Sequence, residues 1–200
     1  VYSCRVSAIP FNQVWPGYQR PVDQTELAGF ASWDADGSAP VEIICQRPVE
    51  SVEVRPRSMA IAPKVEGNRI SFDLAPPRGV VVEVNGRHSP LHLFPSPLEK
   101  DVPAADQQGV IYFGPGVHRP GRVTLQSNQT VYLAPGAVVH GSIQASGVSN
   151  VRVLGRGIID VSTFERDKGG GAIRMTDCEN IVIDGVVMRD PDVWCCSLFG

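Results

Sequence analysis

The sequence has no apolar run that approaches the roughly 20 residues required by a membrane-spanning helix, so we expect no such helix. It has no cluster of basic residues, and a net charge of −3 with a pI near 5.8 argues against nucleic acid as a partner. No segment shows a long helical period. Glycine (20 residues) and proline (17 residues) are frequent instead, which predicts an all-β protein with many turns.

The N-terminus has no basic segment followed by an apolar one, so no signal peptide is visible. The chain does not begin with Met, which leaves open a signal peptide that has been cleaved. The number of cysteines is odd and no C-x-x-C pair occurs, which argues against a structural zinc site. The cysteines are either buried free thiols or, for the first two in an exported protein, a disulfide. They are Cys4, Cys45, Cys178, Cys195 and Cys196.

Residues 1–100 contain no repeat and are predicted to form short strands between Pro, Gly, Asp and Asn turns. Asn85-Gly86, between strands 80–84 and 87–94, is a typical two-residue type I′ hairpin sequence. Short strands at this spacing predict a small antiparallel β-sandwich. The other predicted strands are 4–9, 26–33, 41–45, 52–55, 59–63 and 69–74.

Two local patterns in this first domain each have two interpretations. Residues 11–18, FNQVWPGY, are either a sugar-stacking surface or aromatic side chains that hold a loop against the protein. Residues 34–37, DADG, resemble the start of a calcium loop. They lack the later ligands and the closing Glu of an EF-hand, which favours a plain turn.

A connector rich in proline and charge, at about 95–106, separates this domain from a second one at 101–200. The pentapeptide YFGPG at 112–116 returns as YLAPG at 132–136, and VRVLG at 151–155 and IVIDG at 181–185 continue the phase. A repeat of 20–30 residues built from short strands and glycine turns predicts a solenoid. Stacked coils of this kind pair as parallel strands roughly 4.8 Å apart, with aliphatic side chains inside.

Alignment of the coils by residue number predicts which side chains stack. Gly114, Gly136, Gly155 and Gly185 are expected at the corners, followed by second strands at 137–139, 157–159 and 186–188. Residues 164–171 are an insertion that we expect to project as a flexible, glycine-rich loop before a strand at 172–175. The first inward column is Ile111, Val131, Val151 and Ile181, and the next is Phe113, Leu133, Val153 and Ile183. This pattern is typical of a parallel β-helix.

The same alignment stacks His140, Asp160 and Asp190 at the ends of their strand pairs. Two carboxylates on adjacent coils would lie roughly 5 Å apart, close to the spacing in retaining glycosidases, and their repulsion would raise one pKa. The alternative is a solvated turn whose polar side chains cap the strand ends.

The segment NIVIDGVVMRDPDVW at 180–194 resembles a coil of glycoside hydrolase family 28, the polygalacturonases, with the pattern N-V-x-I-x-G-[VI]-x-[LIV]-x-[NDS]-[SP]-x-x-W. GRGIID at 155–160 is similar to the family's G-x-G-x-I-D segment one coil earlier. The resemblance covers about residues 110–200 and implies the right-handed parallel β-helix of the pectin-lyase-like superfamily. A sandwich before the β-helix also resembles the dextranases of family 49 in that superfamily.

The family's catalytic aspartates lie in an N-T-D element and a D-D pair on later coils, and a His-Gly pair and an R-I-K element follow. No N-T-D, D-D or R-I-K element occurs here, and the His-Gly pair at 140–141 precedes the coil at 180–194, so the resemblance implies structural positions for Asp160 and Asp190. We expect the chain to be the N-terminal part of a longer enzyme whose active site lies beyond Gly200. Accordingly, no catalytic, cofactor-binding or metal-binding residue and no cofactor is assigned.

The expected function is inverting hydrolysis of a polysaccharide or oligosaccharide, in an extracellular or periplasmic protein. The alternatives are a Ca²⁺-dependent pectate lyase and a non-catalytic carbohydrate-binding or tail-fibre β-helix. Asn128-Gln129-Thr130 matches a glycosylation sequon, whose meaning depends on a eukaryotic secretory origin.

Overall fold

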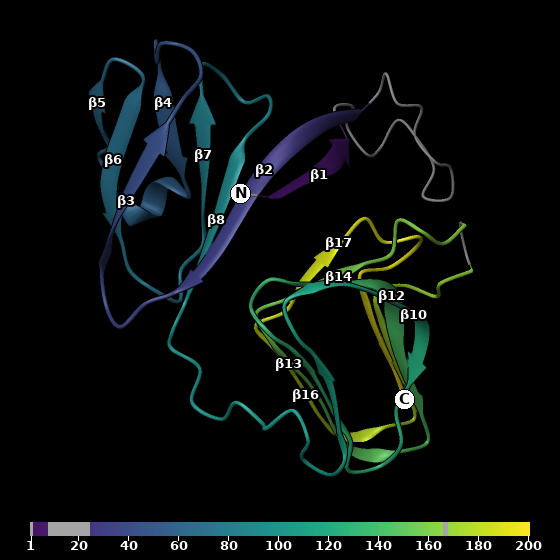
Figure 1. Cartoon of the computed structure of the whole chain (residues 1–200). Coiled ribbons are helices and arrows are strands. Elements are labelled where there is room, and N and C mark those ends of the chain that lie inside the picture. The colour runs from purple at the N-terminus through teal and green to yellow at the C-terminus, as the bar shows by residue number, and fades with distance from the viewer. Residues whose placement is uncertain (1, 8–24, 166–167) are drawn as a thin grey trace. The chain divides into compact units, whose positions relative to one another are not determined.

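The computed structural model describes residues 2–7, 25–165 and 168–200, and the chain divides into two compact units, Val1–Glu99 and Lys100–Gly200 (Figure 1). Strands dominate both units, and the one regular helix among the described residues is the short 3-10 segment η3, Arg57–Met59. The predicted fold class, a β-sandwich followed by coils of a parallel β-helix, is confirmed. The aromatic segment at 11–18 lies outside the described residues.

The first unit contains a five-stranded sheet, in the order β1-β2-β8-β7-β4, and a three-stranded sheet, in the order β3-β6-β5. All neighbours pair antiparallel except β2 and β8, which run parallel. The strands are β1 (Tyr2–Ser7), β2 (Thr25–Asp34), β3 (Ala39–Ile44), β4 (Val52–Arg55), β5 (Lys64–Glu66), β6 (Arg69–Leu74), β7 (Val80–Val84) and β8 (Leu91–Ser96).

The two sheets share one apolar core, because alternate residues of their strands point inward. Val54, Val80 and Leu93 fill it from the larger sheet, and Leu74 from the smaller one. Residues between these positions, such as Glu53 and Arg55 on β4, therefore lie on the outer face of the larger sheet.

The predicted strand at 59–63 is wrong, because η3 occupies residues 57–59 and the chain that follows forms no ladder. The 80–84/87–94 hairpin is present, but β8 begins only at Leu91. The reason is a tertiary contact: the Asn85 side chain accepts hydrogen bonds from the backbone N–H groups of Glu50 (2.8 Å) and Ser51 (3.1 Å). The connection therefore spans residues 85–90 instead of a two-residue turn.

The second unit is a parallel β-helix with one four-stranded stack and one larger sheet that bends. The four-stranded stack runs β9-β11-β13-β16, and β12 lies at the centre of the larger sheet, between β10, β14 and β15. The strands are β9 (Val110–Phe113), β10 (Gly116–Thr124), β11 (Thr130–Leu133), β12 (Ala137–Ser146), β13 (Ser149–Gly155), β14 (Ile158–Asp160), β15 (Ile173–Thr176), β16 (Glu179–Asp184), β17 (Val187–Arg189) and β18 (Cys196–Phe199).

Glycines stand where two coils come too close for a side chain. At the bend within β12, a Cβ on Gly141 would lie 2.2 Å from the carbonyl oxygen of Gly121. A Cβ on Gly155 would lie 2.0 Å from the carbonyl oxygen of Leu133, and Gly155 also has a φ of +123°. In the first coil the left-handed conformation falls on Gly116, not on the predicted Gly114.

The inward columns of the β-helix have a different register from the predicted one. Val131 pairs with Ile111 on one side but with Val153, not Val151, on the other. Val151 pairs with Ile181 as expected. A shift of two residues keeps the same side chains inward, so Val131, Val151 and Val153 are all fully buried and the sequence pattern alone does not distinguish the two registers.

A ladder of asparagines links three coils at one corner. Asn150 donates from Nδ2 to Oδ1 of Asn128 at 2.9 Å, and Asn180 donates in the same way to Asn150 at 2.6 Å. All three have a φ between +53° and +65°, a conformation that Asn tolerates better than most residues. Asn128, the residue of the sequon, is thus the first rung of this ladder.

The cysteines form no disulfide in this structure, so the proposed Cys4–Cys45 bond is absent. Cys4 lies on β1 and Cys45 follows β3, in different sheets. Cys195 and Cys196 are exposed, which makes the buried-thiol interpretation wrong for these two.

Candidate functional site

Three polar side chains from successive coils line up at one edge of the β-helix. His140 on β12 pairs with Asp160 on β14, and Asp160 pairs with Arg189 on β17. The prediction that Asp190 completes this column is wrong. Asp160 pairs with the residue 29 positions later, whereas the predicted alignment assumed a coil one residue longer. A shift of one residue along a strand turns each side chain to the opposite face of the sheet. Asp190 instead follows the end of β17 with a φ of +47°.

Asp160 is the centre of this column. Its side chain is 1% exposed, and Oδ2 accepts hydrogen bonds from Nε of Arg189 at 2.6 Å and from the adjacent guanidinium nitrogen. Oδ1 accepts from the backbone N–H of Ser162 at 2.9 Å and from its hydroxyl. Burial raises the pKa of this carboxyl, but the hydrogen bonds from Ser162 and Arg189 outweigh burial and hold the pKa below its usual value.

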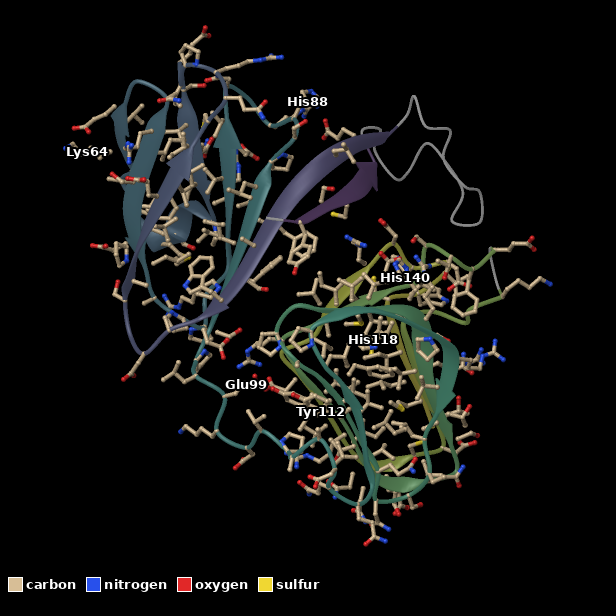
Figure 2. All side chains as sticks on the ribbon, in the orientation of Figure 1. Lys64, His88, Glu99, Tyr112, His118 and His140 are labelled. Atoms are coloured by element: carbon tan, nitrogen blue, oxygen red, sulfur yellow. The ribbon has the colours of Figure 1, made fainter. Side chains whose placement is uncertain are left out.

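His140 completes the column from the preceding coil (Figure 2). Its Nδ1 lies 3.5 Å from Oδ1 of Asp160, and among the described residues this buried nitrogen has no hydrogen-bond partner. The imidazole is 16% exposed, so it lies largely buried beside the carboxylate that Arg189 already neutralises.

This arrangement does not form the carboxylate pair of a retaining glycosidase. The hypothesis required two acids whose mutual repulsion raises one pKa. Asp160 has a guanidinium where the second acid was expected, and its pKa is lowered. It is therefore an ionised residue that ties β14 to β17, and it is unsuited to donate a proton at neutral pH.

A second carboxylate, that of Asp192, binds the glycine-rich insertion. It accepts three backbone hydrogen bonds, from Gly169 (2.8 Å), Gly170 (3.2 Å) and Gly171 (2.9 Å). Successive N–H groups that converge in this way form an anion-binding nest, which glycines with positive φ make accessible. The nest that a phosphate would occupy in other proteins is filled here by the protein's own side chain.

Other contacts hold the same segment against the β-helix. Arg122 donates to the carbonyl of Lys168 and Gln144 donates to that of Gly169, each at 2.7 Å. Gly171 lies so close to the chain at Trp194 that a Cβ would come within 2.3 Å of the Trp194 carbonyl oxygen. The described end of the insertion, residues 168–171, is thus fastened at several points, contrary to the expected free projection.

Beside the contacts that hold residues 168–171, the outward side chains of β10, β12, β15 and β18 form a polar and aromatic surface. Arg174 on β15 lies over the ring of Phe199 on β18, 5.5 Å from the ring centre. Arg122 and Gln144 contribute from β10 and β12, and Phe199 is 52% exposed. Among the described residues no carboxylate pairs with Arg122 or Arg174. We call these four residues the outer arginine face.

Within the described residues, no group of three or more His, Cys, Asp and Glu side chains is placed to hold a metal ion. Of residues 34–37, Asp34 ends β2 and the other three belong to its connection to β3, where the Ala35 N–H donates to the Ser96 carbonyl at 2.9 Å. No helix in the described part of the chain is long and apolar enough to cross a membrane.

Comparison with known proteins reveals a similarity of fold. No family model and no curated protein sequence matches the chain. Among solved structures, the chain is similar to Dex49A from Penicillium minioluteum, with a TM-score of 0.56 and 18% identity over 84% of this chain. The chain spans 47% of the length of that structure, about half. This similarity supports the β-helix fold and does not single out family 28.

Sequence reasoning found Asp160 and His140 but missed Arg189, Asp192 and the outer arginine face. Ser162, two residues after Asp160, was detectable, because Asp and Ser at this spacing often form local side-chain-to-backbone bonds. Nothing local in the sequence connects Asp192 to glycines 21–23 residues earlier in the chain.

Proposed function

We propose that this chain is part of a polysaccharide-degrading glycoside hydrolase of the polygalacturonase type. The observation that carries the proposal is the β-helix with a preceding β-sandwich, a combination that the chain shares with Dex49A over 84% of its length. The resemblance of residues 155–160 and 180–194 to family 28 supports the polygalacturonase type. We further propose that residues 1–100 and 101–200 are separate domains and that the protein acts outside the cell or in the periplasm.

The proposed reaction is an inverting hydrolysis. One carboxylic acid protonates the glycosidic oxygen while a second carboxylate activates a water molecule on the opposite face of the sugar. We place both groups outside these 200 residues, on further coils of a longer protein, because the family's N-T-D and D-D elements have no match here. Asp160 is not assigned to either role, since its pKa is lowered and a guanidinium neutralises it.

We propose that the substrate lies along the outer arginine face. Exposed aromatic rings pack against the apolar faces of pyranose rings, a role that Phe199 suits. Guanidinium groups bind carboxylates through paired hydrogen bonds, which suits Arg122 and Arg174 to the uronate groups of polygalacturonate.

A non-catalytic glycan-binding β-helix is the second candidate. The observation that favours it is the ion pair of Asp160 with Arg189, which replaces the expected pair of acids on the described coils.

The test compares this chain with the product of the complete open reading frame that contains it. Both are incubated with polygalacturonate and with dextran, and reducing ends are measured. We expect release of reducing ends from polygalacturonate by the complete product alone, with inversion at the anomeric carbon visible by NMR.

Each other outcome has a defined meaning. Robust hydrolysis by the 200-residue chain would show that our placement of the acids is wrong. Hydrolysis of dextran alone would overturn the polygalacturonase type. Binding without hydrolysis by the complete product would favour the second candidate.

A further inference from the structure

The sandwich unit contains an open cleft on the outer face of its five-stranded sheet. The cleft encloses about 530 Å³, within the roughly 300–1,000 Å³ typical of small-ligand sites. Its floor and walls come from β4, β7, β8 and the start of η3. The lining residues are Arg55, Pro56, Arg57, Gly79, Val80, Val81 and Phe94.

An aromatic ring forms one wall. Phe94 lies on β8 next to the inward-facing Leu93, so its ring stands on the outer face, where it is 40% exposed. His92, two residues earlier on the same face, stacks with it at 6.2 Å between ring centres. Gly79 keeps the ring accessible, because a Cβ there would lie 3.2 Å from an edge carbon of Phe94. The result is a flat apolar surface in a cleft whose accessible lining is mostly apolar, with Arg55 and Arg57 as its polar side chains.

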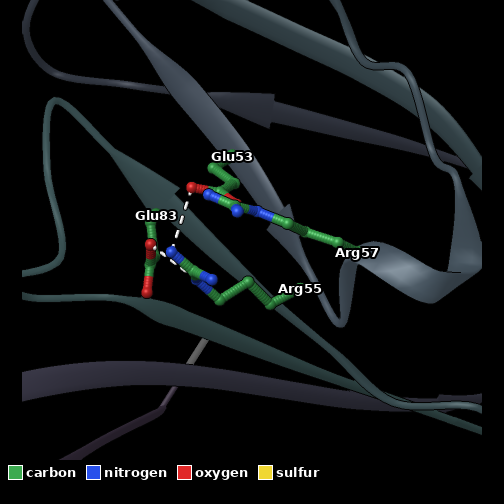
Figure 3. Close-up of polar contacts among 4 residues, drawn as sticks. All are labelled: Glu53, Arg55, Arg57 and Glu83. Atoms are coloured by element: carbon green, nitrogen blue, oxygen red, sulfur yellow. Dashed lines mark hydrogen bonds and ion pairs between the residues drawn. The ribbon is translucent and has the colours of Figure 1, made fainter.

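Arg55 and Arg57 line the opposite end of the cleft, and both pair with glutamates of the same sheet outside its lining (Figure 3). Glu53 on β4 and Glu83 on β7 are directly opposite in the antiparallel ladder, where like charges are unfavourable. Arg55 separates them, with Nε 2.9 Å from Glu83 and a terminal nitrogen 3.0 Å from Glu53. Arg57 donates to the other oxygen of Glu53, and this hydrogen bond lowers the pKa of Glu53.

The charges of these four side chains cancel. Two guanidinium groups face two carboxylates, so the arginines bring hydrogen-bond donors to the cleft but no surplus charge. A ligand carboxylate would therefore gain little net charge attraction there. Hydroxyl groups, by contrast, can accept from guanidinium N–H groups that the glutamates do not use, without breaking an ion pair.

From this combination we infer that the cleft binds a neutral saccharide, with a pyranose ring on Phe94 and its hydroxyl groups on Arg55 and Arg57. The site is distinct from the outer arginine face and requires no catalytic group. It makes the sandwich unit a glycan-binding module, which would hold the protein on a polysaccharide whether or not that polysaccharide is hydrolysed.

The inference is tested by affinity electrophoresis of the 200-residue chain in gels that contain dextran, galactan, glucomannan or polygalacturonate. We expect retardation by at least one neutral polysaccharide that survives 0.5 M salt. Phe94→Ala should weaken this binding at least tenfold, and Phe94→Trp should retain it. Ile44→Ala, at an exposed aliphatic residue on β3 of the other sheet, should have no effect.

A second variant tests the polar contacts of the proposed site. Arg57→Gln leaves Glu53 without one of its cations and should weaken binding several-fold, whereas Lys64→Gln on β5 should not. Circular dichroism establishes that each variant is folded, which is expected for Arg57 because its side chain is 74% exposed.

Three results would overturn the inference: retardation by none of the neutral polysaccharides, retardation that Phe94→Ala leaves unchanged, or retardation by polygalacturonate alone. The last result would transfer binding to the outer arginine face, and an Arg174→Ala variant would then abolish it. Loss of the neutral site would leave hydrolysis of soluble oligosaccharides by the complete protein unaffected, so the two proposals fail separately.

Discussion

Arg189 on β17 lies directly opposite Asp160 on β14 and donates to its carboxylate from Nε at 2.6 Å, across the ladder between two adjacent coils. The Asp160 side chain is almost fully buried, so the pair is shielded from solvent on the carboxylate side. A buried carboxylate of this kind is stable as an ion only while its partners remain in place. The pair therefore fixes the register of the two coils as well as neutralising Asp160.

Asp160→Asn should destabilise the chain by about 3 kcal/mol, because it leaves the guanidinium of Arg189 beside a neutral group. Urea unfolding at pH 7, followed by circular dichroism, measures the loss. Asp184→Asn is the control, since Asp184 is 75% exposed and 4.0 Å from Arg156, and a change below about 0.5 kcal/mol is expected. Equal effects of the two substitutions would contradict the structural role of Asp160.

The same pair predicts a pH dependence. The pKa of Asp160 is lower in the folded chain than in the unfolded one, because its hydrogen bonds outweigh burial. The stabilisation is then fully present above the ordinary carboxyl pKa of about 3.9 and disappears as the pH falls through the folded value. The difference in unfolding free energy between the natural chain and Asp160→Asn should stay constant from pH 7 to 5 and shrink below about pH 4. A difference that grows at low pH would refute this sign.

Asp192→Ala should release the glycine-rich segment, because three backbone N–H groups lose their acceptor. Hydrogen exchange of the amides at 169–171 should accelerate at least tenfold, with a stability loss of about 2 kcal/mol. Asp184→Ala, at an aspartate on β16 whose side chain is 75% exposed, is the matched control. Unchanged exchange at 169–171 would show that Arg122 and Gln144 suffice to hold the segment.

Gly171→Ala and Gly121→Ala separate steric crowding from backbone strain. Both glycines have a positive φ, +91° and +69°, but only at Gly171 would a Cβ collide with a backbone carbonyl, that of Trp194. Gly121→Ala should cost about 1 kcal/mol and Gly171→Ala distinctly more, measured by thermal unfolding. Equal costs would mean that the Trp194 segment moves aside freely.

Asn150→Ala should cost about 1–2 kcal/mol, because it removes the middle rung of the asparagine ladder and places alanine at a φ of +58°. Asn150→Gly keeps the backbone conformation and loses only the two side-chain hydrogen bonds. The difference between the two variants in urea unfolding gives the share of backbone strain. If Asn150→Gly is as stable as the natural chain, the ladder contributes nothing.

The order of strands and the inward positions were predictable from local patterns. Alternation of apolar residues identified Val131, Leu133 and Val153 as core positions, and each is fully buried. Register was not predictable to the same degree. A shift of two residues, as between Val131 and Val153, leaves the inward pattern unchanged, and the one-residue shift at Arg189 occurs where an insertion disrupts the count.

The sequence by itself determined an all-β chain with a sandwich and a β-helix, because strand period, glycine corners and repeat length are local properties that each coil repeats. The tertiary structure decided what the polar residues do. It paired Asp160 with Arg189 instead of Asp190 and bound Asp192 to the glycine nest. It also placed Arg55 and Arg57, each paired with a glutamate, in one cleft with Phe94. These contacts join strands far apart in the chain, and their partners are selected by register and by the spacing between neighbouring strands, which no single segment encodes.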